Sequence, residues 1–91
     1  MTHAIVLVEA ERDAMSTLGG ALSEIEGVGI AYSVTGEWDF VALVHVSRHE
    51  DLREVVTERI AQLPGVARTQ TMVAFEAFSR HDLEAMFSIG G

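Results

Sequence analysis

Cysteine and lysine are both absent from this sequence of 91 residues, and proline occurs once. Without cysteine the chain has no disulfide, no thiolate metal site and no cysteine nucleophile. All 6 basic side chains are arginines, against 14 carboxylates, so the net charge is −8. This acidic balance argues against binding of DNA, RNA or an anionic membrane by the domain itself. The longest apolar runs reach about five residues, far short of the roughly 20 that cross a bilayer.

The residues that are present are typical of one small globular domain. Hydrophobic residues make up 48% of the chain and charged residues 22%, a balance that excludes intrinsic disorder. A chain of this length folds as a single domain. Its first residues lack the basic segment of a signal peptide, which predicts a cytoplasmic location.

The apolar pattern predicts four strands and two helices in the order β-α-β-β-α-β. The strands are expected at residues 3–9, 28–35, 38–46 and 66–78, with helices at 12–26 and 47–63 between them. Ser47 and Glu50 have the spacing of a capping box at the start of the second helix. Gly36 and Glu37 turn the chain between the second and third strands, and Gly36 is expected to have a positive φ.

An internal repeat supports this order. A shift of 38 positions places Val6 on Val44, Leu22 on Ile60 and Gly27 on Gly65. Two copies of a β-α-β unit build a ferredoxin-like α+β sandwich, in which an antiparallel sheet carries both helices on one face. Residues 79–91 are expected to add a short C-terminal helix.

Both faces of the first and third strands are apolar, although the predicted helices cover only one face of the sheet. The uncovered face exceeds the apolar patches that monomers usually expose. The sequence therefore predicts a homodimer that packs sheet against sheet, as a dimeric alpha/beta barrel. The terminal helix is expected to contact a neighbouring subunit.

Two motifs resemble those of a known family. The hairpin reads Tyr32-Ser33-Val34-Thr35-Gly36-Glu37-Trp38-Asp39, and the second helix ends in Leu63-Pro64-Gly65-Val66, with Arg68-Thr69-Gln70-Thr71 soon after. In this order and separation they resemble the effector (RAM) domain of the Lrp/AsnC transcriptional regulators. The resemblance covers about residues 3–78, so the domain is expected at residues 1–78 and a tail at 79–91. Trp38 stands where the family usually has Tyr or Phe.

The resemblance implies a stand-alone binding module for an amino acid or a related metabolite. The sequence starts at the first strand, without the helix-turn-helix domain of full-length members, so no DNA binding of its own is implied. The site would lie between dimers, with the hairpin loop from one dimer and the fourth strand from another. The corresponding positions are Thr35, Gly36, Glu37, Trp38, Asp39, Thr69 and Thr71.

The family also implies partners. Its dimers assemble into larger rings, here expected between tetramer and decamer. A full-length Lrp/AsnC regulator is a further implied partner, through which the module would modulate transcription indirectly.

Each candidate residue also has an interpretation without a ligand. The amides around Gly36 suit a carboxylate, or simply form a hairpin turn. Asp39 suits an ammonium group or nearby backbone amides, and Trp38 forms a ligand wall or a hydrophobic anchor. Thr69 and Thr71 share one strand face, where they bind a ligand or only reflect strand propensity.

Two other classes of function stay open. The same fold hosts small cofactor-free oxygenases and haem-processing enzymes, and a structural adaptor oligomer needs no ligand. The predicted helix stripes offer aliphatic side chains and Met15 rather than polar or haem-ligating groups, so neither a catalytic residue nor a cofactor is expected. The four histidines have no cysteine neighbours and form no metal-ligand motif, so no metal site is expected either.

Overall fold

The computed structural model describes residues 1–78 and residue 80, and it has the predicted order of strands and helices. Apart from residue 80, the tail helix expected at 79–91 lies outside the described residues. The elements are β1 (Thr2–Ala10), η1 (Arg12–Ala14), α1 (Leu18–Ser23), β2 (Val28–Ser33), β3 (Phe40–Val46), η2 (His49–Asp51), η3 (Glu54–Ile60) and β4 (Val66–Ala74). None of the helices in this part of the chain is long and apolar enough to cross a membrane.

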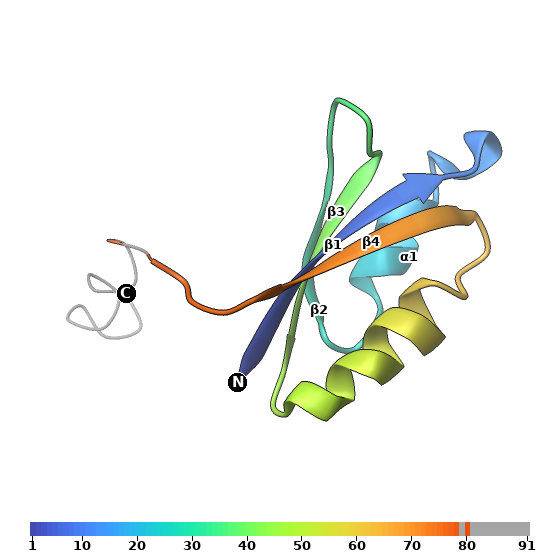
Figure 1. Ribbon diagram of the computed structural model, residues 1–91. Coiled ribbons are helices and arrows are strands. Elements are labelled where there is room, and N and C mark those ends of the chain that lie inside the picture. Colours follow the sequence, from blue (N-terminus) through green and yellow to red (C-terminus); the bar gives the residue numbers. More distant parts are fainter. Residues whose placement is uncertain (79, 81–91) are drawn as a thin grey trace.

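The four strands form one antiparallel sheet in the order β2-β3-β1-β4. β1 lies inside the sheet, where Val6 is opposite Ala42 of β3 on one side and Thr71 of β4 on the other. The helices lie on one side of this twisted sheet (Figure 1). This arrangement confirms the predicted ferredoxin-like α+β fold.

The helix-covered face of the sheet forms the core. Alternate residues of β1 and β3 point to this face and are buried, namely Ala4, Val6, Val8, Phe40, Ala42 and Val44. Leu18 and Leu22 of α1 and Ile60 of η3 belong to the same cluster and are also buried. Each large aliphatic side chain contributes about 1.5–3 kcal/mol when it is fully buried.

The opposite face of the sheet carries apolar side chains that no described residue covers. Ile30 is 42% exposed, Tyr32 50%, Leu43 37% and Met72 42%. The register places these residues on one face, hereafter the open face, with Ile5, Leu7 and Val41. The structure thus confirms the apolar second face, while the dimer deduced from it stays a prediction.

The helices are less regular than the sequence predicts. The helix expected over 12–26 is divided into the single turn η1 and the short α1, which begins at Leu18. Ser16 and Thr17 precede α1, and such hydroxyl side chains compete with helical hydrogen bonds for the backbone. Gly19 and Gly20 lower helix propensity further, by about 1 kcal/mol each relative to Ala.

The second helical segment begins without the predicted capping box. No side chain caps η2, and the Glu50 carboxylate instead accepts a hydrogen bond from the Arg48 guanidinium at 2.9 Å. This hydrogen bond holds the pKa of Glu50 below its ordinary value. Arg48, next to the expected capping residue Ser47, thus binds the Glu50 carboxylate that the capping box would use. The expected regular helix is replaced by the short η2 and the π-helical η3.

Several strand boundaries also differ from the prediction, and β2 ends at Ser33 rather than at residue 35. β4 ends at Ala74, opposite His3, rather than at Phe78, because β1 extends only one residue beyond His3. β3 begins at Phe40 rather than Trp38. The residues before Phe40 belong to the loop that carries most of the predicted site.

Candidate functional site

The loop between β2 and β3, residues 34–39, lies at one end of the sheet and contains most of the predicted ligand-binding residues. The Val34 N–H donates a hydrogen bond to the Asp39 carbonyl at 3.0 Å, which closes the loop. Gly36 has a φ of 108°, as predicted, and a Cβ atom added there would meet nothing within 4 Å. Thr35, Gly36 and Glu37 are exposed. The tip of the loop is therefore open to a ligand or to another subunit.

Asp39 joins the base of this loop to the end of β1. Its Oδ2 atom accepts a hydrogen bond from the Ala10 N–H at 2.8 Å, and its own N–H donates to the Val8 carbonyl at 3.0 Å. Of the two interpretations of Asp39, the bond to a backbone amide is the one present in this chain. An ammonium group that bound this carboxylate would share it with Ala10.

Arg68 of β4 holds the other side of the loop, and sequence reasoning did not place it in the site. Its Cζ atom lies 4.3 Å from the centroid of the Trp38 ring. Its Nε atom lies 3.2 Å from the Glu9 carboxylate, and its Nη2 atom lies 3.7 Å from that of Glu37. Each of these half-exposed contacts contributes about 1 kcal/mol or less. Together they orient Trp38 and Glu37, two of the predicted ligand-binding residues.

Thr69 and Thr71 share one face of β4, as predicted, but this is the helix-covered face. The register places Thr69 opposite Val8 and Thr71 opposite Val6, whose side chains are both buried in the core. Arg68, opposite Glu9, lies on the other face. A single chain therefore does not bring the two threonines together with Trp38.

A cavity next to β4 does include one of the predicted residues. It measures about 490 Å³, and Thr71 and Val73 line it together with Leu52 and Val56 from the second helical segment. Most of its lining is apolar, and Thr71 contributes a hydroxyl group. Thr71 is thus available to a ligand or a subunit that approaches the edge of β4.

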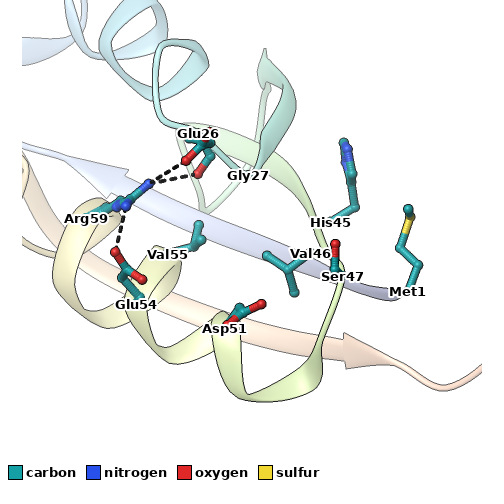
Figure 2. Close-up of a pocket in the computed structure, with 10 residues that line it drawn as sticks. All are labelled: Met1, Glu26, Gly27, His45, Val46, Ser47, Asp51, Glu54, Val55 and Arg59. Atoms are coloured by element: carbon teal, nitrogen blue, oxygen red, sulfur yellow. Dashed lines mark hydrogen bonds and ion pairs between the residues drawn. The ribbon is translucent and has the colours of Figure 1, made fainter.

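Another cavity, of about 500 Å³, lies at the far end of β3 from the loop (Figure 2). Arg59 donates hydrogen bonds to the Glu54 carboxylate at 2.6 Å and to the Glu26 carbonyl at 3.4 Å. The Glu26 carboxylate lies 3.8 Å from the same guanidinium. Figure 2 shows these contacts as dashed lines.

The cavity of Figure 2 and the sequence motif therefore indicate different places. None of the predicted ligand-binding residues lines the cavity of Figure 2, and its single guanidinium is already neutralised by carboxylates of the same chain. The loop carries the motif and is open at its tip, so we place the candidate site there. Within the described residues, no group of three or more His, Asp or Glu side chains could hold a metal ion.

Comparison with known proteins connects these motifs to one family. The family model described as Lrp/AsnC ligand binding domain matches residues 3–83. An uncharacterized HTH-type transcriptional regulator of Pyrococcus furiosus is 32% identical over 77 residues, which are 81% of this chain and 51% of that protein. This chain thus spans about half the length of the curated relatives it matches.

Solved structures show the same fold. A protein from Thermus thermophilus is 44% identical, with a TM-score of 0.82 over 88% of this chain and 100% of that one. The feast or famine regulatory protein of M. tuberculosis, complexed with L-methionine, is 28% identical, with a TM-score of 0.70 over 87% of this chain and 53% of that one. From its sequence and its fold, the chain belongs to the Lrp/AsnC ligand-binding domain family.

Proposed function

We propose that this chain is an effector-binding module of the cytoplasm. It would bind an amino acid or a related small metabolite and would not catalyse a reaction. It would modulate transcription indirectly, through a full-length Lrp/AsnC regulator, and would not bind DNA itself. The observation that carries this proposal is the loop 34–39, which is anchored at its base and open at its tip.

The residues of the loop suit the two charged groups of an amino acid. The backbone amides around Gly36 would bind the carboxylate. Glu37, which is exposed, and Asp39 would attract the ammonium group. Trp38, half-buried under Arg68, would form an apolar wall for the side chain. A relative in this family is complexed with L-methionine, which supports an amino acid as the ligand class.

Assembly would complete the site. We propose that two chains pack through the open face, because Ile30, Tyr32, Leu43 and Met72 are exposed there. Rings of such dimers would bring the loop of one dimer to β4 of another. Thr35 and Glu37 of the loop and Thr71 of β4 are all exposed and available for such a contact.

A thermal-shift screen against all proteinogenic amino acids tests this function. A ligand at 100 times its Kd stabilises the folded state by about 2.7 kcal/mol. We expect a selective shift with one amino acid or a few related ones. The shift should be lost in Trp38→Ala and kept in Met15→Ala, a control at an exposed apolar residue outside the loop and the sheet.

Two results would count against the proposal. If Trp38→Ala keeps the full thermal shift, the ligand does not bind at the loop. No shift with any amino acid, in a chain that still forms a stable oligomer, would favour a structural adaptor.

A further inference from the structure

His3 of β1 and His45 of β3 lie directly opposite each other in the register of the sheet. Their ring centroids are 6.2 Å apart, and the ring planes are inclined by 36°. Both side chains are exposed, and neither has a hydrogen bond or an ion pair with a described residue. The two imidazoles therefore face the same region, with their nitrogen atoms available.

Gly29 of β2 makes room for one of the two rings. The pairing of β2 with β3 is irregular between Val28 and Ile30, which places Gly29 beside His45. A Cβ atom at Gly29 would lie 3.1 Å from Cε1 and 3.3 Å from Nδ1 of His45. Irregular pairing of this kind re-aims side chains, and a glycine in a strand often marks a close approach. The absence of a side chain at Gly29 thus leaves the space that the His45 imidazole occupies.

We propose that His3 and His45 form a two-histidine binding site for a divalent transition-metal ion. Imidazole is a preferred ligand of Zn²⁺, Cu²⁺ and Ni²⁺. Both ligands come from one chain, and neither belongs to the proposed amino-acid site. The register places them on the open face, next to Ile5 and Leu43, so the site lies on the face that we propose for the dimer. The sequence predicts no metal site because these histidines are far apart along the chain, and only the strand register brings them together.

The spacing of the two rings agrees with a shared ion. Metal–nitrogen bonds to histidine measure about 2.0–2.1 Å. With such bonds, the ring centroids of two imidazoles on one ion are separated by roughly 5 Å at a tetrahedral angle and by roughly 6.4 Å when they are opposite. The observed 6.2 Å lies within this interval.

Metal titration of the full chain, after removal of bound metal, tests the site. Calorimetry with Zn²⁺ should show one ion per chain, and His3→Gln and His45→Gln should each weaken binding at least tenfold. His49→Gln, at an exposed histidine outside the pair, should leave the affinity unchanged. With Cu²⁺, the electron paramagnetic resonance spectrum should show coupling to two imidazole nitrogens in the wild type and to one in either pair variant.

Acidification supplies a second readout, since protons compete with the metal for neutral imidazole, and affinity should fall as the pH is lowered. Equal affinity in all three histidine variants, or no binding to the wild type, would overturn the inference. An amino-acid response without metal binding would refute this inference alone and leave the proposed function standing.

Discussion

The Arg68 guanidinium lies 4.3 Å from the centroid of the Trp38 ring, which connects β4 to the loop between β2 and β3. β4 is an edge strand, and β1 separates it from β3. Arg68 reaches across β1, where it also contacts the Glu9 carboxylate at 3.2 Å. The conformation of the candidate ligand loop therefore depends on a residue of a strand that does not pair with either strand of the hairpin.

Replacement of Arg68 by Ala removes the contact with Trp38 and the ion pairs with Glu9 and Glu37. We expect the free energy of unfolding to fall by about 1 kcal/mol, because an exposed cation–π contact contributes about 0.5–1 kcal/mol and exposed ion pairs add little. Arg48→Ala, which breaks only the exposed pair with Glu50, should change the free energy of unfolding less than Arg68→Ala does. Urea unfolding measures both values, and equal losses would refute a special role for Arg68.

Asp39 offers a test that separates a structural role from a binding role. Asp39→Ala leaves the Ala10 N–H without its acceptor and should cost about 1–2 kcal/mol of unfolding free energy. Asp39→Asn keeps an acceptor oxygen and should be close to the wild type in stability. If Asp39 also binds an ammonium group, the Asn variant will fold normally and bind the effector more weakly. Unfolding and binding measured on the same two variants distinguish these roles.

Gly36 and Gly20 should respond to alanine in opposite ways. At Gly36 the φ of 108° is strained for alanine, so Gly36→Ala should cost about 1–2 kcal/mol although the space there is free. Gly20 lies in α1, where a Cβ atom would meet no other atom within 4 Å, and Gly20→Ala should stabilise the chain by about 0.5–1 kcal/mol. Thermal unfolding reads both changes, and stabilisation by Gly36→Ala would contradict the described loop.

The open face can be tested by placing a charge on it. Leu43 is opposite Ile5 within the sheet, and a carboxylate at this position would be buried without a partner in a sheet-to-sheet dimer. Sedimentation should show a dimer or a larger assembly for the wild type and monomers for Leu43→Asp. Met15→Asp, outside the sheet, should keep the wild-type assembly. A monomeric wild type would contradict the proposed dimer directly.

The strands and the core were accessible from the sequence for a simple physical reason. Alternation along β1 and β3 assigned Val6 and Val44 to one face, and the structure buries both. The positive φ of Gly36 was predictable too, because only glycine adopts it without strain. These features depend on neighbours along the chain or on local backbone sterics.

The missed features depend on contacts between distant segments. Arg68 meets Glu9, and His3 meets His45, only through the strand register, which residue spacing does not reveal. The opposite faces of Arg68 and Thr69 likewise follow from their partners in β1. The capping box failed for a local reason, since Arg48 competes for Glu50. The site residues were predicted from a family motif. A single chain does not bring the loop residues and the two threonines together.

Hydrogen–deuterium exchange of the full chain, with and without the amino acid that gives the largest thermal shift, tests the central claim most directly. A ligand bound between subunits at the loop will slow exchange at residues 34–39 and along β4 around Thr69 and Thr71. Protection confined to the cavity beside Arg59, or no change in exchange at a saturating concentration, would contradict the proposed effector site.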